Sequence, residues 1–334
     1  MIVTKQQYHW IAGENLYQAI VKGNRFEAVY HNDEKVFVHS IFDKTVNLET
    51  KSGSLITLAR RDVEEEPATL ISSMPQNGSW HMAGLKNGSE LSFIQDAIYL
   101  NESKIVGGIS AATLWQPAGF SKLCLLPKRS HEEMWRRYKL AMEYMKNNSH
   151  ICHFALFHVL EKLPQILNRR LLLKGNPFLE FFCEGILSLH DLMNIQTEKT
   201  SNIESSVIKL LGLGEGLTPS GDDFLAGVLC CISFLQMVYQ QKYRALQWIA
   251  NSVINNMEKR TNKISCHFLR HAAEGLWGNV TENLLCTLFL FDPEKPNALY
   301  NAIDRKLAQG ASSGMDELIG IFFGLYEWLM NNKP

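Results

Sequence analysis

The sequence has almost no excess charge and few of the motifs that mark metal, redox or nucleotide sites. Lys and Arg total 33 against 34 Asp and Glu, so the formal net charge is −1. This balance argues against a dedicated nucleic-acid binder, which carries a basic excess. The 7 cysteines form no Cys-x-x-Cys pair. We therefore expect reduced cysteines in the core, and the spacing indicates neither a disulfide framework nor a metal site.

Long hydrophobic runs are also missing. The longest mostly apolar run, Phe224 to Leu235, has 12 residues and contains Gly227 and Ser233. A helix needs about 20 apolar residues to span a membrane, so this run predicts a buried helix. The first residues carry no apolar signal core. These observations predict no membrane partner and a cytoplasmic location.

Length and local pattern predict an α+β protein, with a β-rich N-terminal sheet or barrel domain followed by an all-α C-terminal domain. At about 150 residues per domain, 334 residues correspond to about two domains. We place them at residues 1–128 and 129–334. Three short β-branched runs separated by turn residues predict strands in the first: residues 36–41, 45–48 and 54–58.

The second domain begins with helix signals. Ser130 and Glu133 have the spacing of a capping box, and Asn176-Pro177 is typical of a helix start. An apolar stripe at helical spacing follows the first of these, at Met134, Tyr138, Ala141 and Met145. No convincing strand pattern follows residue 130.

Two segments of the helical domain resemble each other. Residues 217–227 and 310–320 both contain Ser-Gly-x-Asp-x-Leu-x-Gly, and each leads into an apolar helical stretch. One interpretation is purely structural: Ser is the N-cap and Asp, three residues later, favours the positive end of the helix dipole. The other interpretation is a ligand site shared by two helix N-termini. The mid-helix glycines Gly227 and Gly320 favour close packing of these helices, on each other or on a ligand.

The ligand interpretation assigns roles to particular residues. Glycine-rich loops at helix N-termini bind anions through backbone N–H groups. An acidic side chain in the first turn would instead accept amide N–H groups or hold a cation. We predict catalytic roles for Asp222, Asp223 and Asp316. The predicted substrate-binding residues are Gly214, Gly216, Thr218, Ser220, Gly221, Thr261, Ser265, Ser312, Ser313 and Gly314. No cofactor is assigned, and a divalent or monovalent cation at the Asp residues stays open.

Known motifs are excluded at this loop, and one neighbouring segment has two interpretations. Gly216 and Gly221 have Walker A spacing, but Asp222 stands where the lysine should be. Ser220 is not part of a Gly-x-Ser-x-Gly elbow. Thr261 or Ser265 caps the following helix, or Thr261, Ser265 and His267 line the same pocket.

The stretch from Gly212 to Gly227 resembles the signature of the AllH-type family. Residues 38–48, 261–275 and 312–316 resemble further parts of that family, so the resemblance covers nearly the whole chain. Glu215 stands where the family often has proline. The resemblance implies a subunit of oxamate carbamoyltransferase that works with other subunits and interconverts oxalurate plus phosphate with oxamate plus carbamoyl phosphate. The alternative is a non-catalytic ligand-binding or scaffolding subunit for a small amide-carboxylate or phosphate ligand.

Overall fold

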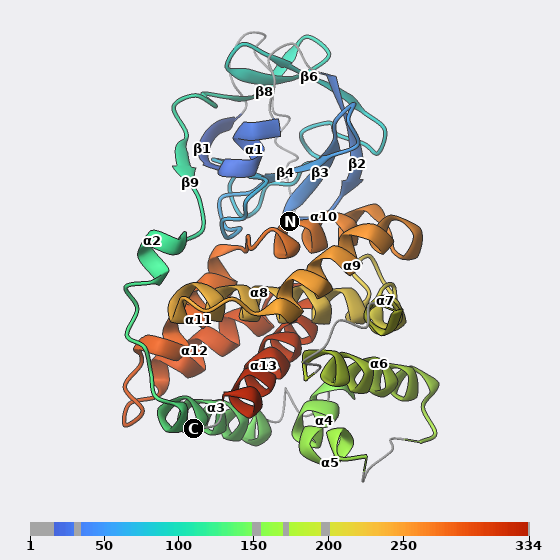
Figure 1. Ribbon diagram of the computed structural model, residues 1–334. Helices are drawn as coiled ribbons and strands as arrows, with labels where there is room; N and C mark the ends of the chain where they lie inside the picture. The colour runs from blue at the N-terminus through green and yellow to red at the C-terminus, as the bar shows by residue number, and fades with distance from the viewer. Residues whose placement is uncertain (1–16, 30–34, 149–154, 170–173, 195–200, 333–334) are drawn as a thin grey trace, which may run out of the picture. The chain divides into compact units, whose positions relative to one another are not determined.

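The structure, a computed structural model, describes residues 17–29, 35–148, 155–169, 174–194 and 201–332. The chain divides into two units, Met1–Gln116 and Pro117–Pro334, each with its own hydrophobic core (Figure 1). We expected the boundary at residue 128. The difference comes from α2 (Phe120–Leu123), which packs into the helical core through Leu123. Four residues are too few to show a helical period in the sequence.

The first unit is an eight-stranded β-barrel with one additional strand. Its strands run in the order β5-β4-β3-β2-β6-β7-β8-β1, and antiparallel pairing of β1 with β5 closes the ring. β9 also pairs with β1, in parallel. The elements are β1 (Tyr17–Gly23), α1 (Asn24–Val29), β2 (Lys35–Ile41), β3 (Thr45–Glu49), β4 (Leu55–Ala59), β5 (Thr69–Ser72), β6 (Glu90–Ile94), β7 (Ala97–Leu100), β8 (Ser103–Gly107) and β9 (Thr113–Trp115).

The barrel interior is filled by alternate side chains of its strands. The three predicted strands are confirmed as β2, β3 and β4, and each buries apolar residues at a spacing of two: Val36 and Val38, Val46 and Leu48, Ile56 and Leu58. Small barrels bury their inward-facing residues in this way because successive strand side chains point to opposite faces.

The second unit is helical throughout its described residues, as the sequence predicted. The capping box at Ser130 and Glu133 and the N-cap at Asn176 are both present. The helices are α2, α3 (His131–Asn147), α4 (Ala155–Glu161), α5 (Leu163–Leu167), α6 (Pro177–Met193), α7 (Ser201–Leu210), α8 (Ser220–Tyr239), α9 (Arg244–Arg260), α10 (Lys263–Ala273), α11 (Asn279–Leu290), α12 (Asn297–Leu307) and α13 (Ser313–Asn331).

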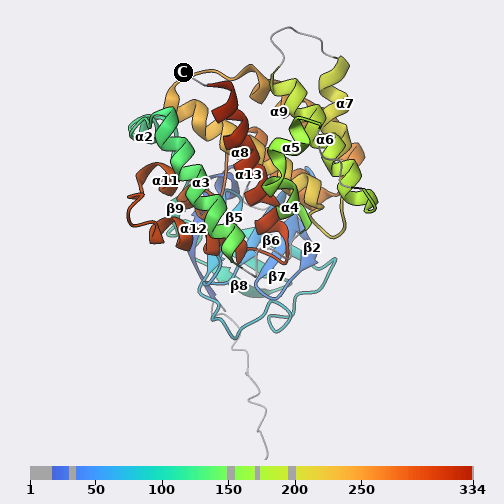
Figure 2. The same cartoon turned by 90° about the horizontal axis from the view of Figure 1, so that it is seen from below.

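Helices α8 and α13 cross at the centre of this unit (Figures 1 and 2). A Cβ atom at Gly320 would lie 2.0 Å from the carbonyl oxygen of Phe224, and one at Gly227 would lie 2.1 Å from that of Glu317. Only glycine permits backbones to approach so closely, so the expected close packing is confirmed. α8 is long and apolar enough to cross a membrane by length and composition, but 83% of that window is buried inside the protein. Such burial is what a central core helix requires.

Candidate functional site

The two repeated elements start α8 and α13, but their serines do not cap them. Ser220 and Ser313 are the first helical residues, and the N-cap positions belong to Pro219 and Ser312. Neither N-cap makes a side-chain hydrogen bond to its helix. The capping interpretation of the Ser-Gly-x-Asp echo is therefore wrong, because neither element builds a side-chain cap.

Each serine instead contacts the aspartate of the other element. The hydroxyls of Thr218 and Ser313 lie 2.6 Å apart. Both hydroxyls hydrogen-bond to the Asp223 carboxyl, and the Ser220 hydroxyl hydrogen-bonds to that of Asp316. Each of these hydrogen bonds favours the ionised form of its carboxyl and so opposes a rise in its pKa. The N-terminal ends of α8 and α13 therefore meet in a reciprocal arrangement. We call these five residues the Ser–Asp cluster.

Two aspartates of the Ser–Asp cluster are buried and incompletely satisfied. Asp223 is 8% exposed and Asp316 is 3% exposed, and the Oδ2 atom of each has no hydrogen-bond partner. Burial, with a contribution from the neighbouring Glu317 carboxylate, raises the pKa of Asp223 to about 8. Burial also raises the pKa of Asp316, and Ser312 joins Ser220 in opposing that shift. Buried polar atoms are almost always paired, so two carboxyl oxygens without a partner among the described residues make the Ser–Asp cluster the candidate site.

Asp222 has a different environment from Asp223. Its Oδ1 atom accepts the backbone N–H of Gly212 at 2.8 Å, and its Oδ2 atom accepts the Thr261 hydroxyl at 2.5 Å. Ser265 also hydrogen-bonds to this carboxyl and opposes the rise in its pKa caused by burial. Asp222 thus ties the loop before α8 to the junction between α9 and α10. The structure brings Thr261 and Ser265 to Asp222, away from a cap role.

The cap of α10 is Asn262, which the sequence analysis missed. Its Oδ1 atom accepts the backbone N–H groups of Ile264 at 3.0 Å and Ser265 at 3.1 Å. The expectation that Thr261 or Ser265 caps this helix is therefore wrong. Asn is as good an N-cap as Ser or Thr, and its position directly before the helical run was the available signal.

The glycines of the two elements serve packing. Gly221 donates its N–H to the carbonyl of Leu213 at 2.8 Å, and Gly314 donates to that of Gln309 at 3.0 Å. A Cβ atom at either glycine would lie 2.0 or 2.1 Å from a carbonyl oxygen at the end of the preceding helix. The expectation that these two N–H groups are open to an anion is wrong, because close packing on the preceding helix already uses them.

The two remaining loop glycines adopt left-handed backbone conformations. Gly214 has φ +119°, and a Cβ atom there would lie 2.8 Å from the backbone nitrogen of Ser220. Gly216 has φ +93° and faces open space. Glycine adopts such angles without steric cost, so both residues shape the approach to α8. Their predicted contact with substrate stays a prediction.

A buried ion pair lies beside the Ser–Asp cluster and was not found from the sequence. Lys306 is 2% exposed, and its Nζ atom lies 2.5 Å from Oε2 of Glu317. Thr281 donates to the other Glu317 oxygen at 2.7 Å and accepts from Lys306 at 2.9 Å. Lys306 therefore neutralises the acid that stands next to Asp316 in the sequence. Among the described residues, no three His, Cys, Asp or Glu side chains are grouped to hold a metal ion.

The fold and the cluster define a class of protein: a β-barrel unit followed by a helical unit whose two central helices begin at paired Ser–Asp elements. Residues 210–325, which include both elements, match the family model described as oxamate carbamoyltransferase subunit AllH. Residues 10–113 match the AllH family N-terminal domain. The chain belongs to the AllH family. No solved structure matches it.

Proposed function

We propose that this chain is a subunit of an oxamate carbamoyltransferase and that it contributes the Ser–Asp cluster to carbamoyl transfer. The enzyme would act in the cytoplasm, together with other subunits of the same complex. The family match supports the assignment to a subunit. The observation that carries a role in the reaction is the pair of buried Oδ2 atoms without partners on Asp223 and Asp316.

The chemistry of the substrates suits these groups. Oxamate and oxalurate each combine amide N–H donors with a carboxylate, and a free carboxyl oxygen accepts an amide N–H. With a pKa of about 8, Asp223 holds its proton at neutral pH and can also donate a hydrogen bond to a carbonyl oxygen. Donors fixed in advance toward a carbonyl stabilise the charge that develops there during transfer.

The proposed transfer is direct. The bond between the carbamoyl carbon and the oxamate nitrogen breaks, and a bond from that carbon to a phosphate oxygen forms. The proton on the phosphate hydroxyl passes to the departing nitrogen, which becomes the amide of oxamate. Asp223 can relay this proton because its pKa lies near the operating pH, the condition for efficient general acid–base catalysis. A cation between the two carboxylates is the alternative occupant of the site.

A second function is favoured by how deeply the two aspartates are buried. With exposures of 8% and 3%, they lie within the helical core and not on an open surface. The chain would then bind a ligand or scaffold its partner subunits without taking part in the chemical step.

The test compares Asp223→Asn and Asp316→Asn with the wild type in the reconstituted complex. Oxamate formation from oxalurate and phosphate is measured, together with assembly by size-exclusion chromatography. We expect kcat/KM to fall by about 10²-fold or more, as when a preorganised transition-state contact is lost, with assembly unchanged. Asp304→Asn is the matched control, since Asp304 is exposed on α12. Wild-type turnover in both cluster variants would refute the catalytic role, and lost assembly with unchanged turnover per complex would favour the scaffold.

A further inference from the structure

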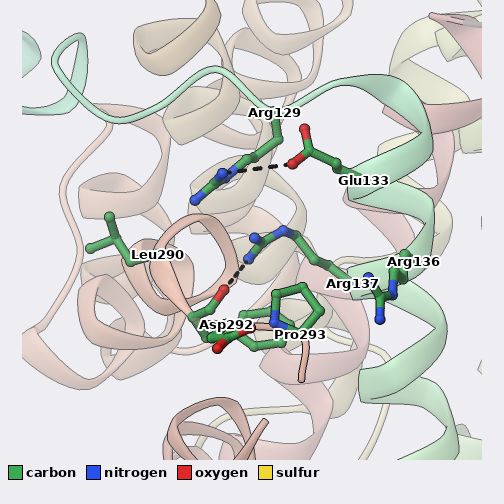
Figure 3. Close-up of a pocket in the computed structure, with 8 residues that line it drawn as sticks. Arg129, Glu133, Arg136, Arg137, Leu290, Asp292 and Pro293 are labelled. Carbon is green, nitrogen blue, oxygen red and sulfur yellow. Dashed lines mark hydrogen bonds and ion pairs between the residues drawn. The ribbon is translucent and has the colours of Figure 1, made fainter. Parts of the chain in front are cut away.

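A positively charged pocket lies between α3 and the C-terminal end of α11 (Figure 3). Its volume is about 400 Å³, enough for a small molecule. Three arginines line it, Arg129, Arg136 and Arg137, against two acids, Glu133 and Asp292. In Figure 3 the Arg137 side chain extends between Arg129 on one side and the Asp292 segment on the other.

Arg137 is a buried cation that forms no ion pair with the described residues. Its side chain is among the most deeply buried in the protein, at 2% exposed. Its Nη1 atom donates to the carbonyl oxygens of Leu288 at 3.0 Å and Phe291 at 2.9 Å, whereas its buried Nε atom has no partner. In the described part of the chain no carboxylate is in ion-pair contact with this guanidinium. Burying an unpaired charge is costly, so such groups normally meet an anion.

The two neighbouring arginines each have an acidic partner. Arg129 donates its Nε atom to the carbonyl of Phe289 at 2.8 Å, and it lies 3.7 Å from Glu133, a loose ion pair. Arg136 is 57% exposed and pairs with Glu294 at the surface. Burial and repulsion from Arg129 lower the pKa of Arg137, whereas attraction to the Glu133 and Asp292 carboxylates opposes part of that shift. An anion in the pocket would attract the Arg137 guanidinium and so offset the cost of its burial and of the repulsion from Arg129.

We propose that this pocket binds a small molecule through an oxyanion group, either a phosphate or a carboxylate. The planar guanidinium offers a fork of N–H donors that matches both groups, and the contacts of Arg137 with the carbonyls of Leu288 and Phe291 use only its Nη1 atom. The pocket lies far from the Ser–Asp cluster. Tyr239, the last residue of α8, donates its hydroxyl to the Arg129 carbonyl, whereas the cluster is at the first residues of that helix, about 30 Å away. The inference is therefore independent of the proposed function.

The competing explanation is that the arginines only cap α11. Arg129 and Arg137 both donate to carbonyls at its C-terminal end, which basic side chains commonly do. That explanation accounts for Nη1 of Arg137 and Nε of Arg129. The Phe291 ring, whose centroid lies 4.6 Å from the Arg137 guanidinium carbon, also favours the charge, but neither contact pairs the Nε atom of Arg137 or accounts for the pocket.

The experiment is calorimetric titration of the full chain with inorganic phosphate, and separately with oxamate, at constant ionic strength set by chloride. Arg136→Gln removes one charge from the pocket. Arg270→Gln is the matched control, since Arg270 is also exposed and also pairs with a surface glutamate, Glu258 at 3.2 Å. We expect Arg136→Gln to weaken binding by about tenfold, the equivalent of one charge-assisted hydrogen bond, and Arg270→Gln to leave it unchanged.

Two further variants separate this site from its alternatives. Arg137→Lys keeps the charge but loses the fork, and should also weaken binding about tenfold. Asp223→Asn should leave this binding intact, which distinguishes it from any anion bound at the Ser–Asp cluster. Tighter binding of phosphate than of oxamate would identify the ligand as a phosphate, and the reverse order as a carboxylate. The proposal is overturned if neither anion binds the wild type, or if the Arg136 and Arg270 variants bind alike.

Discussion

Replacing Asp223 by asparagine should stabilise the helical unit at alkaline pH. The wild-type carboxyl has a pKa of about 8 in the folded protein against an ordinary value of 3.8. Between these values the folded state holds a proton that the unfolded state has lost, so wild-type stability falls as the pH rises through this range. Asparagine has the shape of the neutral acid and no proton to lose. Its stability therefore does not fall for this reason.

The magnitude follows from the two pKa values. Each pH unit in this range changes the free energy of unfolding by about 1.4 kcal/mol, and the slope flattens near the folded pKa. Going from about pH 5 to about pH 8, the Asn variant should gain roughly 3–4 kcal/mol relative to wild type. Groups with raised pKa values that do not interact with Asp223 are present in both proteins and cancel in the difference.

The assay is urea unfolding followed by the helical circular-dichroism signal at several pH values, for the wild type, Asp223→Asn and Asp304→Asn. The signal arises chiefly from the helical unit, which contains both substituted positions. Asp304→Asn is the control for the same carboxyl-to-amide change at an exposed position of this unit. A difference between Asp223→Asn and wild type that stays constant over this range would refute the reasoning. It would mean that Asp223 is ionised in the folded protein and that a positive group neutralises it.

Two further substitutions test the packing and the loop. Gly320→Ala should destabilise the protein by about 3 kcal/mol in thermal unfolding, since the new Cβ atom would lie 2.0 Å from the Phe224 carbonyl oxygen. Gly119→Ala is the control and should be nearly neutral, because no atom lies within 4 Å of a Cβ atom at that position. Thr261→Val should cost about 1–3 kcal/mol, because it removes the hydroxyl that Asp222 accepts and leaves a buried carboxylate oxygen short of a donor. Thr261→Ser, which keeps that hydroxyl, should stay within about 1 kcal/mol of wild type, and equal losses in both variants would contradict this account.

The sequence predicted the local elements of the barrel but not its closure. β2, β3 and β4 follow from alternating β-branched runs separated by turns. The pairing of β1 with β5 joins Ala19 to Ser72 and Val21 to Ile71. Nothing in the local pattern of either strand specifies a partner about 50 residues away, because register there is set by how the whole sheet curves.

At the candidate site, the sequence identified the two elements but not their pairing. The echo around Ser220 and Ser313 showed that two helix starts are alike. Only the packing of α8 on α13 brings each serine to the opposite aspartate. The same limit applies to Arg137, which lies beside the predicted apolar stripe of α3. Its burial depends on carbonyls at the end of α11, about 150 residues later, so no helical period reveals it.

The crossing of α8 and α13 has a consequence for synthesis of the protein. The two helices begin 93 residues apart, at Ser220 and Ser313. From the end of α8 at Tyr239 to the start of α13 the ribosome adds 74 residues, which takes about 4–15 s at roughly 5–20 residues per second. During that interval a 20-residue apolar helix lacks its principal cover. We expect chaperones that hold unfolded chains to bind the nascent chain at this stage, because the apolar helix is exposed. Slowing translation between the two helices should then raise the aggregated fraction more than slowing it after α13.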